Sequence, residues 1–227
     1  LGSLATNTIA ALSTEQVVAL TSDQVSTLAT STIKALSSNQ IQAIETDDIR
    51  VLTSAQIATL TTATVAALST DQIQALKTSQ INQLSTAGVA ALSTDQVVAL
   101  TTEQVNKLTT AATQALSTAS VAALETDDIQ ALSTNSLGAL KTNQVQALST
   151  DQVVALSTAQ IGGLSTSTIN ALSSNQVRAI ETDDIQALSS KQLGSLATST
   201  IAAITTDQVV ALTSDQVSTL ATSTIKA

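Results

Sequence analysis

The chain repeats itself every eight residues over its whole length. Leucine or isoleucine occupies every eighth position from Leu4 to Leu220, at 28 positions with no exception and no insertion. A fixed short period is the sequence signature of a stack of small equivalent units. We therefore expect residues 1–227 to form a single uncapped octad-repeat array of about 28 octads, which we interpret as a piece of a longer array.

Each position of the octad has its own residue type when the octad is numbered from its leucine. Position 3 is serine or threonine at all 28 sites, position 5 is most often glutamine, position 6 is almost always valine or isoleucine, and position 8 is usually alanine. Thr113 is the one polar residue at position 6, where it keeps the shape of valine. The aliphatic positions 1 and 6, with the small position 8, predict a continuous buried seam. The variable positions 4 and 7 are expected to face water.

The chain must turn within each octad, because the side chains of a continuous helix would drift out of an eight-residue register. Phrases such as Ser-Thr-Asp-Gln at residues 93–96 are typical of a helix start, with a hydroxyl cap, an acid in the first turn and a glutamine able to bond back. Either position 2 or position 3 could supply the cap. Position 2 gives the Ser/Thr-x-x-Gln spacing of a capping box, but only position 3 is never replaced, so we favour position 3.

We therefore predict an all-α solenoid with one very short helix per octad, running from position 4 to the next leucine. Such a helix is too short to be stable alone, because helix nucleation is costly, so it must pack against its neighbours. We assume two octads in each layer. The alternative fold is a β-solenoid with threonine, valine and leucine ladders. Alanine, leucine and glutamine favour helices, and only six glycines are present to turn the corners of a β-coil, so we prefer the helical fold.

Longer repeats are superposed on the octad. The phrase Asp/Glu-Gln-Val-Val-Ala-Leu occurs four times and Glu-Thr-Asp-Asp-Ile three times, so that larger repeats start near residues 13, 93, 149 and 205. The steps between them are ten or seven octads, always a whole number. Residues 193–227 repeat residues 1–35 at 31 of 35 positions. We expect Glu-Thr-Asp-Asp-Ile to occur again ten residues beyond Ala227 in a longer parent chain.

The composition excludes most kinds of site chemistry. The 227 residues include no histidine, cysteine, methionine, proline or aromatic residue. A histidine base, a cysteine nucleophile, a disulfide and a histidine metal ligand are therefore all excluded. The net charge of −9 disfavours nucleic acid as a partner, and no apolar run is long enough for membrane insertion. We predict no catalytic, cofactor-binding or metal-binding residues, no cofactor and no enzyme activity.

Three acidic clusters hold the densest charge in the chain: Glu45/Asp47/Asp48, Glu125/Asp127/Asp128 and Glu181/Asp183/Asp184. A weak Ca²⁺ site is one interpretation, since calcium ions take clustered carboxylates. The spacing does not match an EF-hand loop, so we favour acids at helix N-termini, where the helix dipole stabilises them. We interpret the abundant serine and threonine hydroxyls as helix caps. A hydroxyl that caps a helix is already hydrogen-bonded to the backbone, which disfavours an ice-binding threonine lattice.

The phrase Leu-Ser-Thr-Asp-Gln-Val-Val-Ala-Leu at Leu148–Leu156 resembles low-complexity octad regions of very large bacterial surface or secreted proteins. The resemblance covers the whole chain and implies an extracellular or cell-surface stalk, adhesin shaft or filament subunit. We predict a structural rod whose partners are copies of itself, end to end, or neighbouring repeats of the same chain. The alternative is a binding module, such as an adhesin or a glycan- or ice-binding surface, that displays positions 4 and 7. Position 7 varies between Lys34, Gln74 and Gly138, which favours the rod.

Overall fold

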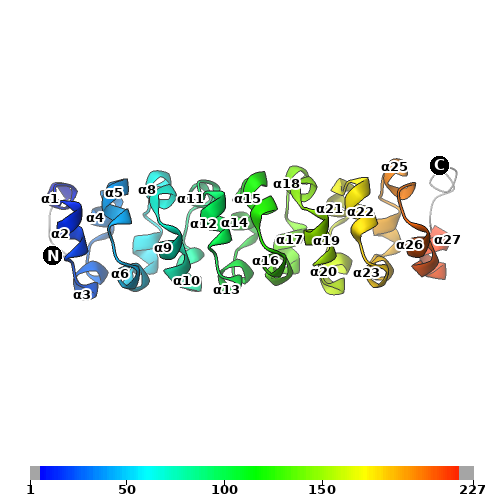
Figure 1. Ribbon diagram of the computed structural model, residues 1–227, viewed down its shortest axis with the longest axis horizontal. Coiled ribbons are helices and arrows are strands. Elements are labelled where there is room, and N and C mark those ends of the chain that lie inside the picture. The colour runs from blue at the N-terminus through cyan, green and yellow to red at the C-terminus, as the bar shows by residue number, and fades with distance from the viewer. Residues whose placement is uncertain (1–5, 220–227) are drawn as a thin grey trace. The chain divides into compact units, whose positions relative to one another are not determined.

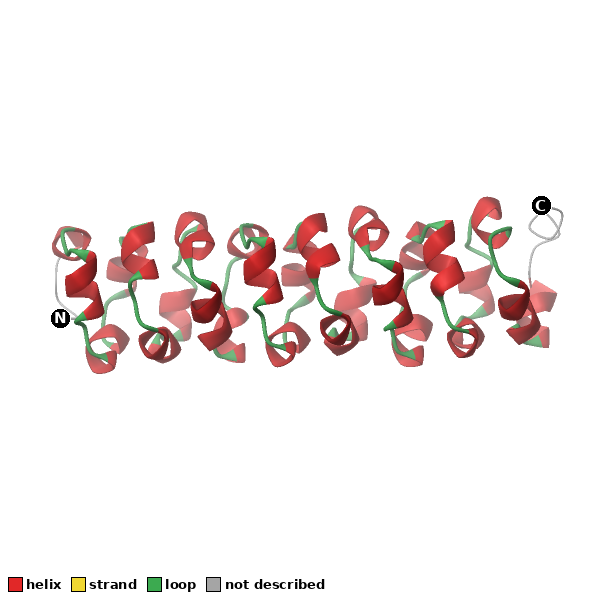
Figure 2. Ribbon diagram, in the orientation of Figure 1, coloured by secondary structure: helices red, strands yellow, loops and turns green. Residues whose placement is uncertain are grey.

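The computed structural model describes residues 6–219 as short helices joined by short loops, with no strand among them (Figure 2). The register positions Leu4, Leu220 and Thr222 lie outside these residues. The prediction of one very short helix per octad is confirmed, and the β-solenoid alternative is wrong for this part of the chain. The structure divides into two compact units, Leu1–Leu116 and Ser117–Ala227, and each is described by itself. A single array over residues 1–227 stays a prediction.

The helices of the first unit begin every eight residues. They are α1 (Thr6–Ala10), α2 (Thr14–Val18), α3 (Ser22–Ser26), α4 (Thr30–Lys34), α5 (Ser38–Gln42), α6 (Thr46–Val51), α7 (Ser54–Ile57), α8 (Thr62–Ala67), α9 (Thr70–Ala75), α10 (Thr78–Ile81), α11 (Thr86–Ala90), α12 (Thr94–Val98), α13 (Thr102–Asn106) and α14 (Thr110–Ala115).

The helices of the second unit keep the same spacing. They are α15 (Thr118–Ala123), α16 (Thr126–Ala131), α17 (Thr134–Gly138), α18 (Thr142–Ala147), α19 (Thr150–Val154), α20 (Thr158–Gly163), α21 (Thr166–Ala171), α22 (Ser174–Ala179), α23 (Thr182–Ala187), α24 (Ser190–Leu193), α25 (Thr198–Ile201), α26 (Thr206–Ala211) and α27 (Ser214–Thr219).

Within each unit, a helix packs against the helix three places further along the chain. In the first unit α3 packs against α6 and α6 against α9, and in the second unit α20 packs against α23 and α23 against α26. The same relation places α8 beside α11 at the upper edge of Figure 1. Three octads therefore make one turn of each solenoid. Our assumption of two octads per layer is wrong, because each helix packs against the helix three octads away and not against the one two octads away.

The helix cap lies at position 2 of the octad. Ser93 has extended backbone angles (φ −69°, ψ 163°), and its hydroxyl accepts a hydrogen bond from the Gln96 N–H at 3.1 Å. The Gln96 Oε1 accepts from the Ser93 N–H at 2.8 Å, which completes a capping box. Our preference for position 3 is wrong, because Thr94 is already the first helical residue. Where position 2 is lysine, the glutamine keeps its half of the box, as Gln80 does for the Lys77 N–H at 2.6 Å, whereas the helices that follow Ala29 and Glu45 have no side-chain cap.

This assignment predicts that two neighbouring hydroxyls contribute unequally to stability. Ser93→Ala removes the acceptor for the Gln96 N–H and should lower the free energy of unfolding by about 1 kcal/mol. Thr94→Ala, one residue later, removes an exposed side chain that caps nothing and should change it by less than about 0.5 kcal/mol. Urea unfolding followed by circular dichroism measures both. A larger loss of stability in Thr94→Ala than in Ser93→Ala would show that the cap is at position 3.

The predicted seam forms the core of each unit. Position 6 is the most deeply buried, with Ile73 and Val121 at 0% exposure, and position 1 follows closely, with Leu76 at 3%. Thr113 at position 6 is also fully buried, and its hydroxyl donates to the Thr109 carbonyl at 3.1 Å, so its polar atom is satisfied inside the core. Position 4 is exposed and position 7 is almost always so, as expected, while the alanine at position 8 is mostly half-buried.

Candidate functional surface

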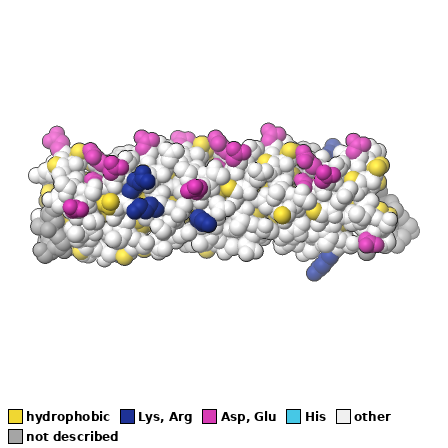
Figure 3. Space-filling model, turned by 90° about the horizontal axis from the view of Figure 1, so that it is seen from below, with side chains coloured by type: hydrophobic (Ala, Val, Ile, Leu, Met, Phe, Trp, Pro, Cys, Tyr) yellow, Lys and Arg dark blue, Asp and Glu magenta, His cyan; other side chains and the backbone are white. Residues whose placement is uncertain are grey.

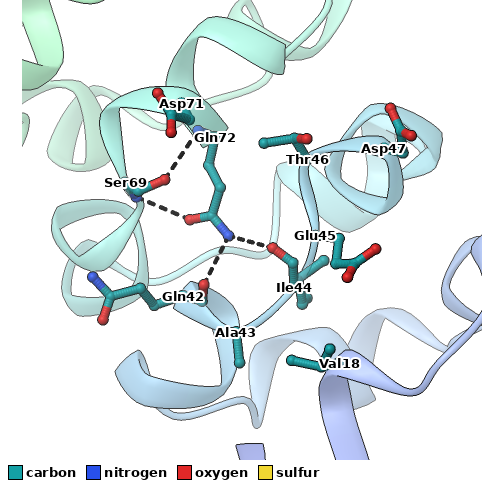
Figure 4. Close-up of a pocket in the computed structure, with 10 residues that line it drawn as sticks. All are labelled: Val18, Gln42, Ala43, Ile44, Glu45, Thr46, Asp47, Ser69, Asp71 and Gln72. Carbon is teal, nitrogen blue, oxygen red and sulfur yellow. Dashed lines mark hydrogen bonds between the residues drawn. The ribbon is translucent and has the colours of Figure 1, made fainter. Parts of the chain in front are cut away.

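The glutamine at position 5 bonds in two directions at once. Gln72 is only 2% exposed, and its Oε1 accepts from the N–H of its own cap residue, Ser69, at 2.9 Å. Its Nε2 donates to the Ile44 carbonyl at 2.6 Å and the Ile41 carbonyl at 3.0 Å, both at the C-terminal end of α5 in the preceding turn. Figure 4 shows Gln72 reaching from Ser69 on one side to the backbone around Ile44 on the other. One side chain therefore caps its own helix and donates to carbonyls at the end of another helix, of which that of Ile41 also accepts from the Ile44 N–H at 3.3 Å.

The same bonds recur within both units. The glutamine Nε2 donates to the carbonyls 28 and 31 residues earlier, as in Gln176 to Leu148 at 2.8 Å and to Val145 at 2.7 Å. The glutamines with this pair of bonds include Gln40, Gln56, Gln72, Gln80, Gln96, Gln104, Gln152, Gln160, Gln176, Gln192, Gln208 and Gln216. We call each of them a glutamine tie. Sequence reasoning missed the ties between turns, although the frequency of glutamine at position 5 was their signal.

Each of the three acidic clusters begins a helix, as predicted. Asp47 and Asp48 lie in the first turn of α6, and the equivalent pairs begin α16 and α23. Asp48 replaces the glutamine, is 5% exposed, and accepts a hydrogen bond from the Ser22 hydroxyl of α3 at 2.6 Å. Among the described residues, no group of three or more such side chains is placed so that it could hold a metal ion. In the first cluster, the structure therefore uses Asp48 to join two turns.

The threonines at position 3 leave their hydroxyls unused. Within the described residues, those from Thr14 to Thr206 make no side-chain hydrogen bond, and all are exposed or half-buried. Occupied caps were our reason to disfavour a threonine lattice, and that reason is wrong, because the caps are at position 2. The first unit thus presents threonine hydroxyls to solvent on each of its three sides, and so does the second.

A shallow hollow of about 510 Å³ lies on the first unit between the turns (Figure 4). Its lining comes from the end of α2, the end of α5, the start of α6 and the start of α9: Val18, Gln42, Ala43, Ile44, Glu45, Thr46, Asp47, Ser69, Asp71 and Gln72. Its lining groups include carboxylates, the side chains of Gln42, Thr46 and Ser69, and one half-exposed valine. The surface seen in Figure 3 carries many acidic side chains and few basic ones.

Comparison with known families finds one match. A family model described as the ALTTAQ repeat matches residues 1–30, 41–78, 75–110, 121–158, 153–179, 177–214 and 190–222. Its six letters fit positions 8 and 1 to 5 of the octad, as in Ala-Leu-Ser-Thr-Ala-Gln at residues 155–160. A search of curated proteins finds no match. No helix in the described part of the chain is long and apolar enough to cross a membrane.

Proposed function

Because the chain belongs to the ALTTAQ repeat family, we propose that it is a structural protein, an elongated spacer whose length is set by its number of octads. The observation that supports this role is the glutamine tie, which joins turn to turn with the same pair of carbonyls in each unit. A stack that depends on contacts between neighbouring turns grows by adding turns, which is what a stalk needs. We further propose an extracellular or cell-surface location, and end-to-end association into filaments, as the resemblance to surface proteins implies.

The spacer role predicts that the chain tolerates the loss of one whole turn. Deleting residues 69–92, three octads, joins Leu68 to Ser93 in register and should keep the helical circular dichroism spectrum. Small-angle X-ray scattering should show a maximum dimension shorter by about 9 Å, the usual spacing between packed helices. Deleting residues 69–80, one and a half octads, should instead unfold the neighbouring turns, because position 6 would fall on the solvent side. An unchanged dimension, or equal damage from the two deletions, would contradict the spacer role.

The second candidate function is a repeated binding surface of the adhesin, glycan-binding or ice-binding kind. The specific observation in its favour is the set of position-3 threonine hydroxyls that have no partner in the described residues. A glycan array and an ice-recrystallisation assay distinguish it from the spacer. Activity that is lost when Thr70, Thr94 and Thr118 are replaced by valine would support binding, since valine keeps the shape and removes the hydroxyl.

A further inference from the structure

The series of glutamines at position 5 has one long interruption. Between Gln16 and Gln216, an octad without glutamine at position 5 has a glutamine octad on each side, with one exception. The exception is a run of four neighbouring octads, residues 108–139, which we call the tie-free run. Because one turn of each solenoid holds three octads, this run is longer than a complete turn. The residues that stand in place of the four glutamines are Ala112, Ser120, Asp128 and Ser136.

None of these four residues carries the amide that a glutamine tie needs. Ala112 has no polar side-chain atom, and the Ser120 hydroxyl is hydrogen-bonded to the hydroxyl of its own cap residue, Ser117, at 2.8 Å. Asp128 and Ser136 have shorter side chains than glutamine and no amide N–H. The helices of the run, α14 to α17, therefore lack the donor that elsewhere reaches the carbonyls 28 and 31 residues earlier.

The structure bridges two of the isolated gaps in other ways. Asp48 accepts a hydrogen bond from the Ser22 hydroxyl of the preceding turn at 2.6 Å, and the Thr168 hydroxyl donates to a carbonyl of the preceding turn at 3.1 Å. The octads on both sides of Asp48 also have ties of their own, from Gln40 and Gln56. A single gap therefore leaves neighbouring turns joined through the adjacent octads, whereas the tie-free run has no glutamine within a whole turn.

The residues of the run lower its stability in two further ways. Thr113, the one polar residue at position 6 of the chain, lies in α14, where its hydroxyl takes the place of a valine methyl group in the core. The last helix of the run, α17, ends at Gly138, and glycine is a poor helix former. The boundary between the two compact units, after Leu116, also falls within the run. Missing ties, a polar core residue and a weak helix therefore coincide in one segment.

From this coincidence we propose that the tie-free run is a yielding point, at which α14 to α17 open before the helices on either side of them. The stability of a turn in a repeat stack is the sum of its own stability and that of its contacts with neighbouring turns, so the turn with the fewest ties opens first. The two flanking parts of the chain stay folded. In the proposed spacer, such a segment lengthens under load at one defined place, and this consequence alone rests on the proposed function.

Limited trypsin digestion of the full chain tests the proposal, because cleavage at a lysine in a folded segment requires local opening around it. Lys141 directly follows the run, and Lys77 is its matched internal control. Both lysines are exposed at position 2, and their N–H groups donate to Gln144 at 2.8 Å and to Gln80 at 2.6 Å. Mass spectrometry of the products identifies each cut. We expect cleavage at Lys141 to be about tenfold faster than at Lys77.

A repair variant restores glutamine in all four octads, and a matched control adds glutamine one residue earlier in each helix, at exposed positions, with the same change in charge. Repair should slow cleavage at Lys141 to within about threefold of the rate at Lys77, whereas the control should leave it within about twofold of the unmodified chain. The repair variant is Ala112→Gln, Ser120→Gln, Asp128→Gln and Ser136→Gln, and the control is Ala111→Gln, Ala119→Gln, Asp127→Gln and Asn135→Gln.

A transfer variant, Gln56→Ser with Gln72→Ser, keeps the test decisive where the repair variant does not fold. With Asp48 and Thr64 it creates a second run of four octads without glutamine, which ends before Lys77 as the natural run ends before Lys141. Cleavage at Lys77 should become about tenfold faster. Circular dichroism before digestion shows whether each variant is folded.

Three results would each overturn the proposal. They are equal cleavage rates at Lys77 and Lys141 in the unmodified chain, equal rates at Lys141 in folded repair and control variants, and no acceleration at Lys77 in the folded transfer variant. The deletion experiment measures the length of the chain and digestion measures local opening, so the spacer role and the yielding point can fail separately.

Discussion

Replacing Ile129 with aspartate is expected to lower the free energy of unfolding of the second unit by about 4–5 kcal/mol. Ile129 is at position 6 of α16 and has 0% exposure. A carboxylate there would be buried without a partner, and such a group loses its hydration without a compensating hydrogen bond. Its own carbonyl accepts the Nε2 of Gln160 at 2.9 Å, so the distortion should also loosen the tie to the next turn.

Urea unfolding by circular dichroism gives the overall loss, and hydrogen exchange locates it. Exchange should become faster in α16 and in the helices that pack on it, while α5 and α8 in the first unit keep their rates, because repeat stacks unfold locally. Gln130→Asp is the matched control, since it adds the same charge at the next, exposed residue and should cost less than about 1 kcal/mol. A melting curve of Ile129→Asp that matches the unmodified chain would mean that position 6 is not the core.

The short helices and the buried seam could be predicted because they depend on neighbouring residues alone. The aliphatic residues at positions 1 and 6, represented by Leu76 and Ile73, recur in a register that only a chain turning within each octad can bury. Even Thr113 follows this logic, since it has the shape of valine and its hydroxyl bonds back to the preceding helical turn. These predictions needed no knowledge of which octads meet.

The prediction of the cap position is wrong because a residue type that never changes along the repeat need not be the one that caps the helix. Ser69 and Thr70 both offer a hydroxyl, and only the extended backbone at Ser69 aims its oxygen at the Gln72 N–H. Position 2 varies all the same: Gln80 still bonds the backbone N–H of Lys77, and the helices after Ala29 and Glu45 form with no side-chain cap at all. The strict serine or threonine at position 3 is therefore not explained by capping, and the second candidate function is based on the threonine hydroxyls among them.

The sequence does not show which distant octads become neighbours on the surface, because this depends on the number of octads in one turn. Glu45 and Asp47 were visible as an acidic cluster, but Val18 was not connected with them, because positions so far apart in sequence become neighbours only when a turn holds three octads. The glutamine ties have the same origin, since the bond from Gln72 to Ile44 spans 28 residues. Local pattern therefore predicts the octad, whereas the candidate site depends on how octads stack.

The second large loss of stability is expected from Gln104→Glu, which alters a glutamine tie. Gln104 is 2% exposed and its Nε2 donates to the Leu76 carbonyl at 2.6 Å and the Ile73 carbonyl at 2.9 Å. A buried carboxylate would place negative charge against both oxygens and remove their donor, so at neutral pH the free energy of unfolding should fall by about 3–4 kcal/mol. Gln104→Ala, which removes the donor without adding charge, should lower it by about 2 kcal/mol.

The pH dependence separates the charge from the lost bond. Burial beside two carbonyls raises the pKa of the carboxyl introduced by Gln104→Glu in the folded chain above its unfolded value of about 4.3. The protonated form can donate to a carbonyl as glutamine does, so the stability of Gln104→Glu relative to the unmodified chain is highest below about pH 4 and is lost as pH rises through the folded pKa. The deficit of Gln104→Ala should not change with pH. Gln74→Glu, at exposed position 7, should match the unmodified chain. A pH-independent deficit in Gln104→Glu would show that the carboxylate escapes to solvent and that the tie between turns is not held in the core.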